Sequence, residues 1–177
     1  MLSHILIFIF TTTIIYTSRN ITLFGNNTLG YYYIEALVGT PPQRKALILD
    51  TGSHMTIFPC HGCGTCRNHL YKIFDSTKSS TFKKVDPSSE YFGWSCSTPT
   101  DNGQCKFLQS YTEGSEYAGY YAIDNFIFEN ELKSNKHKNL KHVFGCAMKE
   151  TNMFYSQEVD GILGLGVRTN EKSKLKR

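Results

Sequence analysis

The chain has 177 residues, of which 40% are hydrophobic and 19% are charged, and its net charge is +4. This length fits one domain with its own core and excludes two domains of ordinary size, while the hydrophobic content excludes a disordered chain. The basic excess lies mainly in residues 133–142 and 171–177, which interleave no aromatic residues, so we expect solvated loops and no nucleic-acid partner.

The amino-terminal segment predicts entry into the secretory pathway. Residues 1–18 contain no acid, and the apolar run 5–16 is short for a membrane span but fits the hydrophobic region of a secretory signal. We therefore predict a signal peptide and a location in the endoplasmic reticulum lumen or outside the cell. A signal anchor, which would leave the chain attached to the membrane, and a buried first strand remain alternatives. Sequons at Asn20 and Asn26 are compatible with a lumenal chain.

Residues 31–52 predict two strands around a turn. Aromatic and β-branched residues come first, and Gly39-Thr40-Pro41-Pro42 is a turn signal. A continuous apolar run then leads to Asp50. A continuous apolar run indicates a strand that is buried on both faces. Residues 75–82 form a polar connection with little periodicity.

The second half of the chain predicts further strands. Residues 106–124 contain two β-prone segments on either side of residues 112–115, which is typical of a hairpin with Gly114 at its tip. Further short strands are expected at 125–130 and 142–148, and the glycines of 159–167 indicate close backbone approach. Because no long amphipathic helix is expected, the predicted fold class is all-β.

Six cysteines form an even set, which an oxidising compartment would pair as disulfides. They are Cys60, Cys63, Cys66, Cys96, Cys105 and Cys146. A zinc site is the alternative, with His61 or His69 as the fourth ligand. Zinc patterns usually have a second ligand pair at a fixed distance, and this pair is missing, so disulfides are favoured. The sequence alone permits fifteen pairings.

Five segments occur in an order and spacing that resemble a known family. They are "GTPPQ", "ILDTGS", "YTEGS", Phe144-Gly145 and "DGILGLG". Together they resemble the amino-terminal lobe of the pepsin-like aspartic proteases over residues 31–167. The resemblance implies an all-β, pepsin-like acid protease fold of which this chain has only the amino-terminal lobe. The basic polar tail at residues 168–177 interrupts the lobe and is the expected truncation point.

The resemblance assigns a catalytic role to Asp50. Two carboxylates a few ångströms apart share one proton, so that one activates water while the other protonates the carbonyl of a peptide bond. Asp50 matches the first of this pair. Thr51, Gly52 and Ser53 match the tight turn that holds its carboxylate in place. The family acts on polypeptides and needs no cofactor or metal.

The hairpin resembles the mobile flap that closes over substrate in this family. Tyr111 matches the flap tyrosine, and Thr112 and Gly114 belong to the tip, where glycine supplies backbone freedom. Glu113 lies where an acid would favour a basic substrate residue, with Gln157 as a second acceptor. A solvated turn glutamate is the alternative for Glu113.

The cysteines resemble those of the cysteine-rich, nepenthesin-type branch, and most closely its plasmepsin V group. This resemblance implies the disulfides Cys60–Cys63, Cys66–Cys146 and Cys96–Cys105. It also implies an endoplasmic-reticulum protease that cuts after leucine, with a basic residue two places earlier.

One departure from the family is large, because no second Asp-Thr-Gly or Asp-Ser-Gly occurs in the sequence. We therefore expect half of an aspartic endopeptidase that is inactive alone and whose partner is a missing carboxy-terminal lobe. Two alternatives remain open. They are a non-catalytic half-lobe that binds peptide or protein, and a zinc-binding cysteine module.

Overall fold

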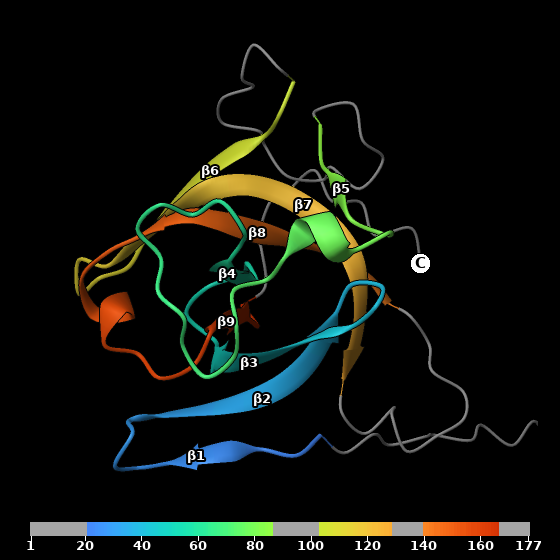
Figure 1. The fold of residues 1–177 in the computed structure, drawn as a ribbon. Coiled ribbons are helices and arrows are strands. Elements are labelled where there is room, and N and C mark those ends of the chain that lie inside the picture. The colour runs from blue at the N-terminus through green and yellow to red at the C-terminus, as the bar shows by residue number, and fades with distance from the viewer. Residues whose placement is uncertain (1–20, 87–102, 129–139, 167–177) are drawn as a thin grey trace, which may run out of the picture.

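The computed structural model describes residues 21–86, 103–128 and 140–166 as nine strands with two short 3-10 turns (Figure 1). The strands are β1 (Phe24–Asn26), β2 (Tyr31–Val38), β3 (Gln43–Asp50), β4 (Ile57–Pro59), β5 (Lys83–Lys84), β6 (Lys106–Ser110), β7 (Glu116–Phe128), β8 (Leu140–Glu150) and β9 (Gly161–Gly164). The turns are η1 (Ser76–Lys78) and η3 (Asn152–Tyr155). The all-β prediction is confirmed.

Several sequence predictions lie outside the described residues. They are the signal segment 1–18, the sequon at Asn20, Cys96 and the tail 168–177. Within the part of the chain that the structure describes, no helix has the length and apolar character needed to cross a membrane.

The strands close into a ring. Their order is β1-β2-β3-β9-β4-β8-β7-β5, and β7 also pairs with β2. The strands β2, β3, β9, β4, β8 and β7 therefore form a closed path. Figure 1 shows β7 and β8 curving together over one side, with β1 and β2 on the opposite side. Closure pairs the backbone of the long strands on both sides, which leaves few unpaired edges in this part of the lobe.

The predicted strand pair at residues 31–52 is confirmed as β2 and β3. They pair antiparallel from Tyr33 opposite Ile48 to Val38 opposite Gln43. The continuous apolar run enters β3, where Ala46 and Leu47 are fully buried. The connection at residues 75–82 contains η1, which Asp75 caps by accepting a hydrogen bond from the Thr77 N–H.

The predicted hairpin is confirmed as β6 and β7, but the separate strand expected at 125–130 is wrong as far as the structure describes it. Residues 125–128 continue β7, which runs from Glu116 to Phe128 without a break. The continuation is explained by tertiary pairing, because Phe126, Ile127 and Phe128 face Val38, Leu37 and Ala36 on β2. Local sequence cannot reveal this partner.

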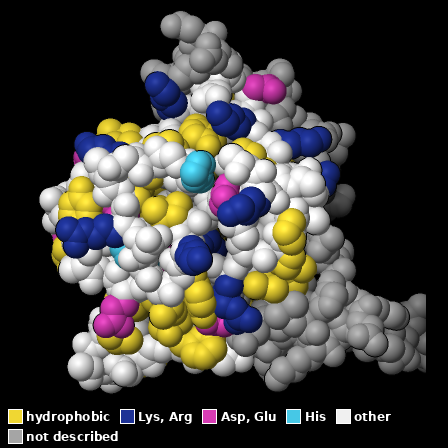
Figure 2. Space-filling view, in the orientation of Figure 1, with side chains coloured by type: hydrophobic (Ala, Val, Ile, Leu, Met, Phe, Trp, Pro, Cys, Tyr) yellow, Lys and Arg dark blue, Asp and Glu magenta, His cyan; other side chains and the backbone are white. Residues whose placement is uncertain are grey.

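Two hydrophobic clusters fill the lobe on opposite faces of β4. Phe58 belongs to the first cluster and stacks on Phe144 with ring centroids 4.7 Å apart. Ile57, its neighbour, belongs to the second cluster, which includes Phe107 and Phe154. Adjacent strand residues point to opposite faces, so this short strand anchors both clusters. On the face shown in Figure 2, lysine and arginine side chains are dispersed, and the absence of a nucleic-acid partner stays a prediction.

Candidate active site

A cavity of about 720 Å³ brings together four of the predicted site residues. Asp50, Tyr111, Glu113 and Gln157 line it, although they come from β3, the β6–β7 hairpin and the segment after η3. Thr51, Thr112 and Gly114 do not line it but are next to lining residues in the chain, and Gly52 and Ser53 do not line it but hydrogen-bond to Asp50. The cavity is therefore the candidate substrate cleft.

Asp50 reaches the cavity because β3 ends there beside β9. The two strands pair in parallel, with Asp50 opposite Gly164, and the Leu165 N–H donates to the Asp50 carbonyl over 2.7 Å. The Gly166 N–H donates to the Ser53 carbonyl over 2.8 Å. These backbone bonds fix the turn after β3 without using the Asp50 side chain.

The predicted need for glycine at position 164 is confirmed. A Cβ atom added to Gly164 would lie 2.4 Å from the Met55 nitrogen, which is too close for any side chain. The clash is with backbone, so the turn that carries Asp50 would have to move.

We expect Gly164→Ala to lower the free energy of unfolding by about 1–3 kcal/mol, because overpacking a tight contact forces backbone shifts. Gly64→Ala is the matched control, since a Cβ at Gly64 meets nothing within 4 Å. Urea unfolding of both variants measures the difference. Equal stability of the two variants would show that the contact at Gly164 relaxes without cost.

The Asp50 carboxylate is held by the turn that follows it. Its Oδ1 accepts from the Gly52 N–H over 2.8 Å, and its Oδ2 accepts from the Ser53 hydroxyl. Ser53 is 4% exposed, whereas Thr51 lies on the surface. The described contacts to the carboxylate thus come from Gly52 and Ser53. They orient the two carboxylate oxygens.

The β6–β7 hairpin lies over the cavity with a tight turn at its tip. The Tyr111 N–H donates to the Ser115 carbonyl and the Gly114 N–H donates to the Tyr111 carbonyl, each over 2.9 Å. Gly114 has a φ of +89°, a conformation that side chains disfavour, so glycine is required at this tip as predicted.

Tyr111 turns its ring toward the cavity and against Phe154, with ring centroids 5.4 Å apart in an edge-to-face arrangement. Its hydroxyl is buried and completes no hydrogen bond. Burial raises the pKa of Tyr111, as do the negative charges of Asp50 and Glu113, while the nearby Ser53 hydroxyl lowers it. The Ser53 hydroxyl donates to Asp50 and makes no hydrogen bond with Tyr111. The Tyr111 hydroxyl is left as a neutral donor at the cleft.

Residues 151–158, which we call the wall segment, form one side of the cavity and contact the hairpin. The Asn152 side-chain amide donates to the Gly114 carbonyl over 2.6 Å, and the Glu116 N–H donates to the Thr151 hydroxyl over 2.9 Å. The Met153 N–H donates to the Ser115 hydroxyl over 3.2 Å. Hairpin and wall segment are therefore joined at the cavity entrance.

The cavity has an acidic character. Asp50, Glu113 and Glu158 line it, and its described lining includes no lysine, arginine or histidine. Glu158 was not predicted, and neither was Tyr31, whose pKa is raised by burial and by the Glu158 charge. These residues reach the cavity through the start of β2 and the wall segment. No local pattern marks them in the sequence.

The cysteine pairing implied by the resemblance is wrong where the structure describes it. The disulfides are Cys60–Cys146 and Cys63–Cys66 instead of Cys60–Cys63 and Cys66–Cys146. The reason is that β4 and β8 pair in parallel, with Phe58 opposite Cys146, which brings the Cα atoms of Cys60 and Cys146 within 5.4 Å. Cys105 is buried and disulfide-bonded, but its predicted partner Cys96 lies outside the described residues.

The zinc alternative loses its ligands in this arrangement. Cys60, Cys63 and Cys66 are all in disulfides and offer no thiolate. His69 is occupied by Glu150 and by the Gln157 carbonyl. In residues 21–86, 103–128 and 140–166, no group of three or more metal-binding side chains converges.

Asp160 is not a second catalytic carboxylate. It is 3% exposed, and its two oxygens accept from the Ala46 N–H over 2.7 Å and the Tyr71 N–H over 2.9 Å. Burial raises the pKa of Asp160, while these backbone bonds and the charges of Lys45 and His69 lower it. Its role is to join β3 to the loop at residue 71. The described cavity therefore has one carboxylate held in an Asp-Thr-Gly turn.

Comparison with known proteins gives a consistent picture. The family described as Xylanase inhibitor N-terminal matches residues 32–171. The chain is 38% identical over 148 residues to Aspartic protease 5 of Toxoplasma gondii and 35% identical over 149 residues to Plasmepsin V of Plasmodium falciparum. It is 30% identical over 138 residues to Aspartic proteinase nepenthesin-2 of Nepenthes gracilis. These matches cover 76%, 82% and 77% of this chain but only 15%, 24% and 30% of the respective relatives.

Proposed function

The chain belongs to the Xylanase inhibitor N-terminal family, the amino-terminal domain family of pepsin-like aspartic proteases, and on this premise we propose that it is the first catalytic lobe of an aspartic endopeptidase. Its substrates are polypeptides. A carboxy-terminal lobe supplies the second carboxylate, and the lobe described here is inactive alone.

The observation that carries this proposal is the placement of Asp50. Its carboxylate is oriented by Gly52 and Ser53, opens on the cavity, and lies on the side that the Tyr111 hairpin covers. One carboxylate of the pair takes a proton from water, which attacks the carbonyl carbon of the peptide bond. The other carboxyl group gives its proton to the carbonyl oxygen. The tetrahedral intermediate then collapses, its C–N bond breaks, and the amine leaves with a proton.

The test is peptide hydrolysis by this chain alone and together with a carboxy-terminal lobe that carries a second Asp-Thr-Gly or Asp-Ser-Gly. We expect hydrolysis only from the two-lobed protein, with inhibition by a pepstatin-type compound that spans both carboxylates. A folded two-lobed protein that cleaves no peptide would contradict the proposal.

We also propose that the cleft prefers a basic substrate residue two places before a scissile leucine. Glu113 and Gln157 line the cavity, and the amide oxygen of Gln157 is of the kind that accepts from a cationic side chain. Glu113 supplies the charge, and a charge-assisted hydrogen bond to arginine is stronger than a neutral one.

We expect Glu113→Gln to reduce the preference for arginine over norleucine at this substrate position by roughly tenfold to a hundredfold, because the charge-assisted bond becomes neutral. The measurement is the ratio of kcat/KM, in the two-lobed protein, for two peptides that differ at this position. Glu116→Gln is the control, since Glu116 also lies on the hairpin but bonds to Ser110 and does not line the cavity. An unchanged ratio in Glu113→Gln would show that Glu113 is a solvated turn glutamate with no part in substrate preference.

The proposed site of action is the secretory pathway, in the endoplasmic reticulum lumen or beyond it, where the protease processes other proteins. The Cys60–Cys146 and Cys63–Cys66 disulfides support an oxidising compartment. The apolar residues 5–16 support entry by a signal that is either removed or kept as a membrane anchor.

A non-catalytic lobe that binds peptide or protein is the second candidate. It is favoured by the single Asp-Thr-Gly carboxylate of the described cavity. It predicts that the chain binds peptides without cleaving them, with or without a second lobe, and that Asp50→Ala leaves function intact.

A further inference from the structure

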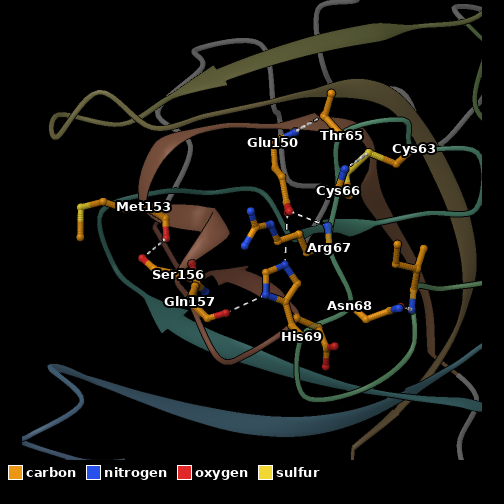
Figure 3. A network of polar contacts seen from close by, with 12 residues as sticks. Cys63, Thr65, Cys66, Arg67, Asn68, His69, Glu150, Met153, Ser156 and Gln157 are labelled. Carbon is orange, nitrogen blue, oxygen red and sulfur yellow. Dashed lines mark hydrogen bonds and ion pairs between the residues drawn. A yellow bond between two sulfur atoms is a disulfide. The ribbon is translucent and has the colours of Figure 1, made fainter.

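His69 lies buried between two hydrogen-bond acceptors (Figure 3). Its side chain is 4% exposed, its Nδ1 is 2.6 Å from the Gln157 carbonyl oxygen, and its Nε2 is 3.3 Å from Glu150 Oε2. A neutral imidazole carries one N–H and satisfies only one acceptor, whereas an imidazolium donates to both. The arrangement therefore favours the charged form of His69.

Glu150 fixes the position of His69 from the end of β8. It is the last residue of β8 and is fully buried. Its Oε1 accepts from the Arg67 N–H over 2.8 Å, while Oε2 receives His69. Residues 67 and 69 follow the Cys63–Cys66 disulfide, so one carboxylate anchors this whole loop to the end of β8.

On its other side, His69 holds the wall segment. Met153, Phe154, Ser156, Gln157 and Glu158 line the cavity. The carbonyl that His69 binds belongs to Gln157, whose side-chain nitrogen is buried without a partner. A buried unpaired donor at a cavity wall is costly unless a ligand pairs with it. The main-chain bond to His69 keeps this donor at the cavity. The Arg67 guanidinium, 5.2 Å from the centre of the Tyr155 ring, adds a second contact from the same loop.

We propose that His69 is a positioning residue, which in its charged form holds the main chain of Gln157 against the Glu150-anchored loop and so sets the wall of the substrate cleft. The ligand expected there rests on the proposed function, but the positioning of the wall does not. His69 lies behind the cleft and is not among the residues that line it.

Several charges surround His69 and decide how its charge depends on pH. Glu150 faces it from β8 and Asp160 from the residue before β9. Lys45 on β3, together with Arg67 and Tyr71 on its own loop, lines the same small internal space. Burial opposes protonation, but the hydrogen bonds to Glu150 and Gln157 and the charges of Glu150 and Asp160 outweigh it and raise the pKa of His69.

The direction of the pH effect follows from this raised pKa. The stabilisation from charged His69 is fully present below the pKa of the unfolded chain and is lost as the pH rises through the pKa of the folded chain. When the proton is lost, either Glu150 or the Gln157 carbonyl loses its donor. The wall segment should then become less protected.

The test uses His69→Gln, whose amide can serve one acceptor but carries no charge, in the full chain. His61→Gln is the matched control, since His61 lies on the same loop but is exposed. Hydrogen exchange gives the protection of amides 152–158 between about pH 5.5 and 8.5, a window around the ordinary histidine pKa. We expect wild-type protection to fall about tenfold as the pH rises, as for the loss of a charge-assisted bond. We expect low protection at every pH in His69→Gln and wild-type behaviour in His61→Gln.

Peptide binding adds a second measurement. The probes are a labelled decapeptide with arginine two places before leucine and the same peptide with norleucine in place of arginine, both followed by fluorescence anisotropy. We expect the affinity of wild type for the arginine peptide to fall about tenfold over this pH range and to be weak and constant in His69→Gln. The norleucine peptide should show little of this dependence.

The outcomes separate the two proposals. Wild-type protection of 152–158 that stays constant with pH, or that is equal in His69→Gln, overturns the positioning role. If neither peptide binds wild type while the protection follows His69, the proposed recognition of a basic residue by this lobe fails and the positioning role stands. Because the wild-type titration needs no substitution, the inference can be tested even if His69→Gln does not fold.

Discussion

A two-lobed protein that carries Asp50→Asn is expected to lose peptide hydrolysis by roughly 10²–10⁴-fold, the contribution typical of a general acid or base. Asparagine cannot take a proton from water or share one with a second carboxyl group. The fold should be retained, because the amide oxygen of the substituted side chain can still accept from the Gly52 N–H that binds Oδ1 of Asp50 now. The measurements are kcat/KM for a peptide substrate and the free energy of unfolding in urea.

The matched control is Asp75→Asn, which makes the same chemical change at a turn away from the cavity. Asp75 caps η1 and does not line the cleft, and asparagine is also a good cap. This variant should keep its activity. Full activity in Asp50→Asn would remove Asp50 from the mechanism and favour the non-catalytic lobe.

The two described disulfides should differ strongly in their contribution to stability. Cys60–Cys146 spans 86 residues and Cys63–Cys66 spans 3. In the chain-entropy description, we expect Cys60→Ala with Cys146→Ala to lower the free energy of unfolding by roughly 4–5 kcal/mol, and Cys63→Ala with Cys66→Ala to lower it by roughly 1.5 kcal/mol. Urea unfolding without reductant compares the two double variants.

Peptide mapping of the wild-type chain, together with the two double variants, tests which cysteines are paired. A protease digest of the unreduced wild-type chain should give one peptide pair joined through Cys60 and Cys146 and one joined through Cys63 and Cys66. The pairing Cys60–Cys63 with Cys66–Cys146 would contradict the arrangement of β4 and β8. Both double variants would then leave two unmatched cysteines and lose stability to a similar extent.

The sequence predicts well what depends on local pattern. The apolar run before Asp50 predicts β3, and the glycine at the hairpin tip predicts the turn at Gly114. The absence of a side chain at Gly164 lets β9 pass close to the backbone of Met55. In each case, a residue type with a specific conformational property lies in the element that needs it.

What the sequence could not predict depends on contacts between distant segments. The partner of Cys60 follows from the parallel pairing of β4 with β8, and the length of β7 follows from its pairing with β2. Glu158 reaches the cavity because the wall segment folds against the hairpin, so no periodicity marks it. Glu158 and Tyr31, which such contacts bring to the cavity, were therefore not predicted.

The joined hairpin and wall segment constrain how a polypeptide enters. Asn152 binds the Gly114 carbonyl, Met153 binds the Ser115 hydroxyl, and Phe154 lies against Tyr111. If the hairpin lifts by itself, these three contacts break. If they persist, the hairpin and residues 152–154 move together and widen the entrance as one body. On the proposed function, admission of a long chain is then coupled to the hairpin that carries Glu113, so entry and selection are not independent steps.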